Sequence, residues 1–183
     1  MERLWGDLAG RSRESGGTQS AGRRDLVLSG ALSRYRILHF ATHGLLHPVL
    51  PERSGLVLST VDEKGRPRDG FLSAPDVASL HLPADLVVLS ACRTGLGREI
   101  RGEGLVGLTQ AFFRAGARGV IVSSWNVRDR ATADLMTRFY THHLVERQPP
   151  GAALRQAQLA LRAHPKTAAP AFWAGFTLHG DWR

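Results

Sequence analysis

The sequence predicts one α/β domain built on a parallel or mostly parallel β-sheet. Runs of apolar, strand-forming residues alternate along the chain with segments in which apolar residues recur at helical spacing. Two of the runs, LVVL at 86–89 and GVIV at 119–122, contain no polar residue, which is typical of strands that helices cover on both faces. With 183 residues, the chain is long enough for a single sizeable core.

The first third of the chain contains a lead-in and the first expected elements. Residues 1–22 are rich in Gly, Ser, Arg and Thr without a sustained period and predict a loosely ordered lead-in, so that the domain occupies residues 23–183. The elements expected next are a short helix at 24–33, strands at 35–41 and 55–60, and turns at 62–70.

The rest of the chain predicts alternating helices and strands. Ser73 is expected to cap a short helix, because Pro75 falls in its first turn and Asp76 lies three residues after the cap. Further on, strands are expected at 86–90, 119–125 and 172–178, and helices at 104–115, 131–145 and 152–163. Gly116 and Pro165 are expected to end the first and the last of these helices.

The formal charge of +8 suggests nucleic-acid binding at first sight. Nearly all of the positive charge is arginine, since only Lys64 and Lys166 are lysines. The arginines are scattered, with no aromatic residues interleaved for base stacking. The pattern therefore argues against nucleic-acid binding as the main role, and a basic face for an acidic partner stays open.

The sequence also indicates a compartment. No stretch reaches 18 apolar residues and the N-terminus lacks an apolar signal core, so neither a membrane span nor a secretory leader is expected. Cys92 is the only cysteine, which excludes an internal disulfide and a cysteine zinc site. We expect a cytoplasmic protein.

Cys92 and His43 each come just after a predicted strand. In parallel sheets ligands bind beyond the carboxyl ends of the strands, and the loops that follow two neighbouring strands face each other. A histidine beside a cysteine can take the proton of the thiol, whose ordinary pKa of about 8.5 leaves it mostly protonated at neutral pH. The pair therefore predicts nucleophilic cysteine chemistry.

Both residues also have a structural interpretation. A free cysteine is usually a small buried side chain, and a single histidine at the end of a strand usually makes an ordinary hydrogen bond. From the residue types alone, the catalytic and the structural interpretation stay open.

Two other patterns carry less information than their form suggests. GEGLVG at 102–107 has the glycine spacing of a dinucleotide-binding loop, but about a dozen residues separate it from the preceding strand, whereas that fingerprint starts directly after one. His39, His43 and His47 recur every four residues, as metal ligands do on a helix, but Gly44 and Pro48 break a helix there. We expect neither a dinucleotide nor a metal ion.

Five segments, in this order, carry a resemblance to a known family. They are RILHFATHG (36–44), ADLVVLSACRTGLG (84–97), GEGLVGLTQAFFRAGARGVIVSSWNVRDRAT (102–132), FY (139–140) and FWAGFTLHGD (172–181). A His-Gly pair followed some tens of residues later by Ala-Cys resembles the catalytic signature of the caspase-like cysteine peptidases. The whole set resembles the CHAT domain, a bacterial branch of that group often found with tetratricopeptide repeats.

The resemblance implies a fold and a reaction. The fold would be the three-layer caspase-hemoglobinase arrangement with a mostly parallel sheet. His43 would be the general base and Cys92 the nucleophile of a cysteine endopeptidase that forms a thioester acyl-enzyme. The backbone N–H groups of Gly44 and Cys92 would donate to the oxyanion, and no metal or organic cofactor is implied.

The resemblance also implies where a protein or peptide substrate binds. In this fold the strand after the cysteine helix lines the substrate groove, which makes Ser124, Trp125 and Asp129 candidate substrate-binding residues. A carboxylate such as Asp129 can pair bidentately with arginine, so cleavage after a basic residue is expected. Asp129 can equally cap the helix expected near Ala131, and the two roles are not exclusive.

Two departures from the family pattern shape the alternatives. Arg93 follows the cysteine, where CHAT sequences frequently carry an acidic or other polar residue. The family's first strands have no counterpart before residue 24, so a domain truncated at its N-terminus, with an exposed sheet edge, is expected.

The alternatives are a catalytically silent binding or scaffold module of the same fold and, well behind it, a basic nucleic-acid-binding domain. Activity is expected to depend on a sensor or repeat-containing partner.

Overall fold

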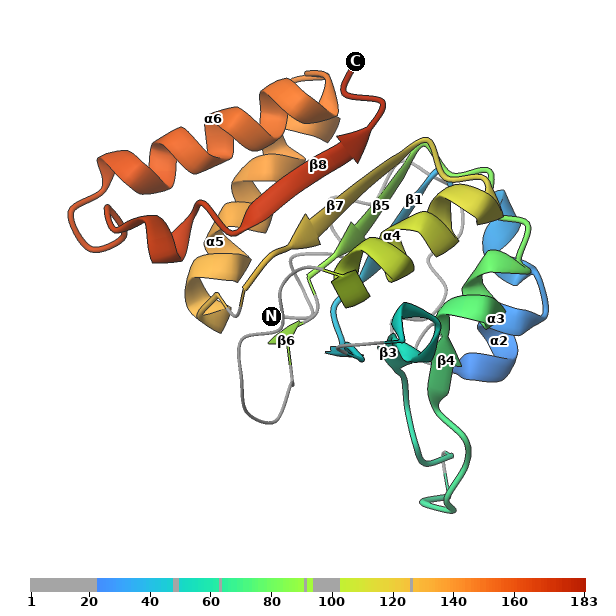
Figure 1. Ribbon diagram of the computed structural model, residues 1–183. Helices are drawn as coiled ribbons and strands as arrows, with labels where there is room; N and C mark the ends of the chain where they lie inside the picture. Colours follow the sequence, from blue (N-terminus) through green and yellow to red (C-terminus); the bar gives the residue numbers. More distant parts are fainter. Residues whose placement is uncertain (1–22, 48–49, 63, 91, 94–102, 126) are drawn as a thin grey trace.

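The computed structural model describes residues 23–47, 50–62, 64–90, 92–93, 103–125 and 127–183 (Figure 1). Their strands form a central sheet and a second, small sheet. The predicted α/β class with a mostly parallel sheet is confirmed. The predicted lead-in at 1–22 and the first glycine of the pattern at 102–107 lie outside the described residues.

The central sheet contains three parallel strands and one antiparallel strand. In spatial order they are β1 (Ile37–Phe40), β5 (Leu86–Leu89), β7 (Gly119–Ser123) and β8 (Phe176–Gly180). The first three run parallel, and β8 pairs antiparallel with β7. Every residue of β5 and β7 is buried, which explains the unbroken apolar runs at 86–89 and 119–122. The last strand starts later than predicted, because Pro170–Phe172 form the 3₁₀ helix η4.

The small sheet was not predicted. In spatial order its strands are β4 (Phe71–Ser73), β3 (Gly55–Val57), β2 (His43–Leu45) and β6 (Cys92–Arg93). The strand expected at 55–60 belongs here and pairs antiparallel with β2 and β4, while β2 and β6 are parallel. Strands of two or three residues are too short to show an alternating pattern, so no sequence pattern indicated β2, β4 or β6.

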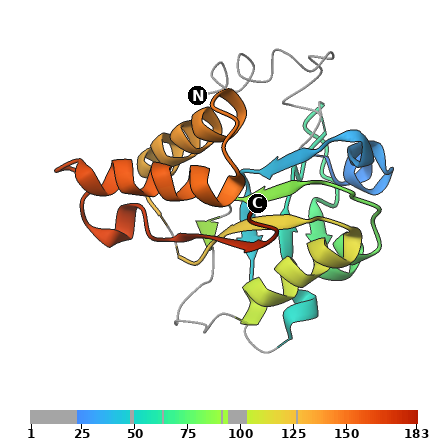
Figure 2. The same cartoon turned by 90° about the horizontal axis from the view of Figure 1, so that it is seen from above.

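Helices lie on both sides of the central sheet (Figures 1 and 2). One side carries α2 (Arg24–Leu28), α3 (Ala74–Ala78) and α4 (Glu103–Ala115); the other carries α5 (Asp129–Tyr140), the π-helix η3 (Thr141–Val145) and α6 (Pro150–Ala163). The side chains of β5 alternate between the two sides, so Val87 and Leu89 share a core with α4, whereas Leu86 and Val88 share a core with α5 and α6. Within the described ranges, no helix combines the length and the apolar character needed to cross a membrane.

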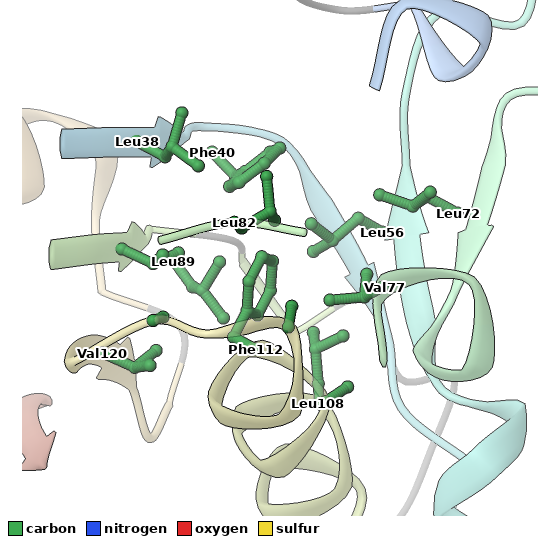
Figure 3. Close-up of a cluster of buried hydrophobic side chains, with 14 of the residues drawn as sticks. Leu38, Phe40, Leu56, Leu72, Val77, Leu82, Leu89, Leu108, Phe112 and Val120 are labelled. Carbon is green, nitrogen blue, oxygen red and sulfur yellow. The ribbon is translucent and has the colours of Figure 1, made fainter. Parts of the chain in front are cut away.

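Phe112 of α4 lies at the centre of the larger core (Figure 3). Its side chain is fully buried, and its ring packs against that of Phe40 of β1 with 5.5 Å between the ring centroids. Leu56 and Leu72 of the small sheet and Val77 of α3 belong to the same cluster. This core therefore joins the small sheet to the central sheet.

The helix boundaries show which local signals determine the structure. Ser73 caps α3 as predicted: its Oγ accepts a hydrogen bond from the Asp76 N–H at 3.2 Å, and the Asp76 carboxylate accepts one from the Ser73 N–H at 3.0 Å. The helix predicted at 24–33 is wrong in its second half, because Gly30 has a φ of 80° and separates α2 from the 3₁₀ helix η1 (Ala31–Arg34).

Candidate active site

The segments that carry the predicted site residues leave the central sheet at one edge. β1 and β5 are parallel neighbours with Phe40 opposite Leu89, and β7 is the next strand, with Val122 opposite Leu89. His43, Cys92 and Ser124 follow the carboxyl ends of these three strands in turn. This is the edge at which ligands bind in parallel sheets.

The small sheet brings the backbones of His43 and Cys92 side by side. The two residues are register partners in the parallel pair of β2 and β6. Neighbouring strands lie about 5 Å apart, so positions distant in sequence become adjacent here. The His43 side chain is exposed. The arrangement supplies the proximity that a cysteine–histidine pair requires, and the catalytic roles of both residues stay predictions.

Strand pairing also fixes the residues around His43. Thr42 donates a hydrogen bond from its hydroxyl to the Val57 carbonyl, and Val57 is the register partner of His43 on β3. Gly44 is buried and lies between Leu56 of β3 and Arg93 of β6. The predicted oxyanion donor thus occupies the middle of the small sheet, directly beside the strand that carries Cys92.

The candidate substrate-binding residues lie after β7. The Ser124 N–H donates to the Gly175 carbonyl at 2.7 Å, and the Trp125 indole N–H donates to the Ala171 carbonyl at 3.3 Å. The Trp125 side chain is 38% exposed, so it offers an aromatic surface at this edge of the sheet. These contacts fix the segment against η4 and the residue that precedes β8.

Asp129 is not the cap of the helix that follows. Helix α5 starts at Asp129 itself, two residues earlier than expected, and Arg128 occupies the N-cap position without a capping side-chain hydrogen bond. Asp129 is exposed in the first helical turn, where its negative charge interacts favourably with the helix dipole. Its role in recognising a basic side chain stays a prediction.

Three further side chains near the predicted site form a hydrogen-bonded group that the sequence did not reveal. His39 Nε2 lies 2.7 Å from Ser90 Oγ, and His39 Nδ1 lies 3.1 Å from Tyr140 Oη. Burial lowers the pKa of His39 to about 4 and raises the pKa of Tyr140. We call Tyr140, His39 and Ser90 the His39 network. The position of Ser90 at the end of an apolar strand was the one sequence signal that could have singled it out.

A cavity of about 1130 Å³ lies beside β1, and His39 and Tyr140 form part of its wall. Its lining also includes Arg36, Asp85 and Arg118, which directly precede β1, β5 and β7. The cavity therefore extends toward the amino ends of the parallel strands, away from the edge that carries His43 and Cys92.

Comparison with known proteins places the chain in a family. The CHAT domain model matches residues 9–181. Tetratricopeptide repeat protein 28 of Mus musculus is 37% identical over 114 residues, and its Homo sapiens counterpart is 35% identical over 111 residues. These matches cover 62% and 61% of this chain but 5% and 4% of the relatives, so the chain spans a small part of their length. Both relatives are mammalian, so they do not support a bacterial origin, which the resemblance to the bacterial CHAT branch implies. The chain belongs to the CHAT domain family, which is related to the caspase-like cysteine peptidases.

Proposed function

We propose that the chain is a cysteine endopeptidase of the three-layer caspase-like type, with His43 as general base and Cys92 as nucleophile. The observation that supports the proposal is the parallel register that sets His43 directly opposite Cys92. Two residues 49 positions apart in the sequence become neighbours beyond the carboxyl ends of adjacent strands, where the chemistry of such sheets takes place.

The proposed reaction proceeds through a thioester. His43 takes the proton of the Cys92 thiol, and the thiolate attacks the carbonyl carbon of the scissile peptide bond. Backbone N–H groups of Gly44 and Cys92 donate to the oxyanion that forms. The C–N bond then breaks, and His43 returns the proton to the departing amine. Water hydrolyses the remaining thioester and restores the thiol.

Labelling with a cysteine-reactive peptide probe tests the proposal, because Cys92 is the only cysteine. We expect rapid labelling of the wild-type chain and a roughly 100-fold slower rate for His43→Ala, since a positioned base contributes about that factor to proton transfer. His81→Ala is the matched control, because His81 is also exposed but follows α3, away from the site, and this variant should react at the wild-type rate. Slow labelling at one common rate in all three proteins would contradict the peptidase proposal.

The second candidate is a catalytically silent module that binds or scaffolds other proteins. It is favoured by the two relatives, whose names describe repeat proteins and in which the matching segment is a small part of the chain. In either case we propose a repeat-containing or sensor partner. A slow probe reaction that His43→Ala leaves unchanged, together with correct folding, would favour this candidate.

Asp129 is proposed to select a basic residue before the scissile bond. Asp129→Asn should lower the ratio of labelling rates between an arginine-bearing and a norleucine-bearing probe by about ten- to 100-fold, because a hydrogen bond to a charged group is worth about 1.5–3 kcal/mol. Asp134→Asn, an exposed aspartate on the same helix that pairs with Arg138, is the control and should keep the ratio. An unchanged ratio in Asp129→Asn would make the residue structural.

A further inference from the structure

The His39 network joins three elements that are far apart in the sequence. His39 lies on β1, Ser90 directly follows β5, and Tyr140 is the last residue of α5. The two hydrogen bonds span 51 and 101 positions of the chain. Tyr140 is buried and packs edge-on against Phe139 with 4.9 Å between the ring centroids, so α5 holds the phenol in place.

The chemistry of the three groups assigns the direction of both hydrogen bonds. Because burial keeps His39 neutral at physiological pH, one ring nitrogen donates and the other accepts. The phenol is a better donor than acceptor, so Tyr140 Oη–H donates to His39 Nδ1, and His39 Nε2–H donates to Ser90 Oγ. An imidazole suits this position because its two nitrogens point in different directions from one rigid ring.

Ser90 is held twice at the point where the chain leaves the central sheet. Its backbone N–H donates to the Phe40 carbonyl at 3.2 Å, and its side chain is held by His39. Two residues later, Cys92 pairs with His43, which itself lies three residues after Phe40. The contacts of Ser90 therefore join the two strands from which both proposed catalytic residues depart.

We propose that the His39 network sets the position of the Cys92 backbone opposite His43, with His39 and Ser90 as positioning residues for the cysteine chemistry. The inference rests on the proposed function for its catalytic meaning, but the positioning itself concerns only the backbone at Ser90, Cys92 and Arg93. It also gives different roles to two histidines four residues apart: the exposed His43 would take the proton of the thiol, and the half-buried His39 would hold the backbone through Ser90.

Substitutions at His39 and Ser90 test the proposal in the full chain. Ser90→Ala removes the hydroxyl, and we expect the maximal rate of Cys92 labelling by the peptide probe to fall at least tenfold. The probe concentration that gives half of the maximal rate should change less. His39→Gln retains a donor near the position of Nε2, whereas His39→Asn retains a polar group only near Nδ1. Gln should therefore restore most of the rate and Asn should not. Tyr140→Phe, which removes the outer hydrogen bond, should reduce the rate a few-fold.

Hydrogen–deuterium exchange separates this proposal from the proposed function. In Ser90→Ala and His39→Asn the backbone amides at residues 86–90 and 92–93 should exchange at least tenfold faster than in the wild type, whereas the amides of β8, which pairs with β7 and not with β5, should be unchanged. If labelling does not depend on His43 but this local change occurs, the peptidase proposal fails and the positioning proposal holds. If labelling depends on His43 but Ser90→Ala changes neither rate nor exchange, or if Gln and Asn at position 39 behave alike, the positioning proposal is overturned.

Discussion

Phe112→Ala should lower the free energy of unfolding by about 3–5 kcal/mol, the usual cost of truncating a fully buried phenylalanine. The phenyl ring is completely buried and packs between Phe40 of the central sheet and the cluster that contains Leu56 and Leu72 of the small sheet. Truncation would leave a cavity where the two sheets meet. Urea denaturation, with the midpoint and the slope both measured, gives the change directly.

The neighbouring Phe113→Ala is the matched control for this prediction. Phe113 has the same side chain on the same helix but is only partly buried at the border of the core. We expect a loss of about 1–2 kcal/mol, in proportion to the smaller apolar area that it buries. Equal losses for the two variants would contradict the central place of Phe112 between the sheets.

The parts of the fold that could be predicted are those with strong local signals. The apolar runs of β5 and β7 identified them as central strands, and both are buried along their whole length. Ser73 and Asp76 predicted the start of α3 because a capping box is formed by residues three positions apart. The start of α3 is decided by interactions between residues a few positions apart. The strands β5 and β7 are recognised from burial alone, which their apolar sequences reflect.

The parts that could not be predicted depend on distant partners. Strand β6 is only two residues long and exists because Cys92 and Arg93 pair with β2, which no local pattern encodes. The helix predicted at 24–33 ends early, because the backbone at Gly30 adopts a left-handed conformation. The apolar residues around Gly30 are compatible with a continuous helix, so their spacing does not reveal this break. Short elements whose stability comes from tertiary contacts therefore cannot be predicted from the periodicity of apolar residues.

The candidate site also contains residues that the sequence identified and residues that it did not. The sequence placed His43 and Cys92 after two strands of a parallel sheet, and the structure shows that these strands are neighbours. His39 drew attention only through its spacing from His43, and Tyr140 only as part of the FY pair at 139–140. Their roles depend on hydrogen bonds across 51 and 101 positions, which only the folded chain brings together.

His39 should make the stability of the protein depend on pH between about 4 and 6.5. Burial lowers the pKa of His39 from 6.5 to about 4 in the folded protein, so in this window the unfolded chain binds the proton and the folded chain does not. The free energy of unfolding therefore falls as the pH decreases from 6.5 to 4 and is unaffected by His39 above that range. A shift of this size corresponds to at most about 3 kcal/mol, and on the order of 2 kcal/mol is expected because the ring borders the cavity beside β1.

Comparison with His39→Gln isolates this contribution, because glutamine keeps the contact with Ser90 but does not titrate. Several aspartates with lowered pKa values, including Asp62 and Asp76, also lose stabilising interactions in acid, but they do so equally in both proteins. The difference between the two unfolding free energies should therefore change by about 2 kcal/mol between pH 7 and pH 4 and stay constant above pH 7. A constant difference across the whole range would mean that His39 can take up a proton without cost, and thus that the network does not hold the ring away from water.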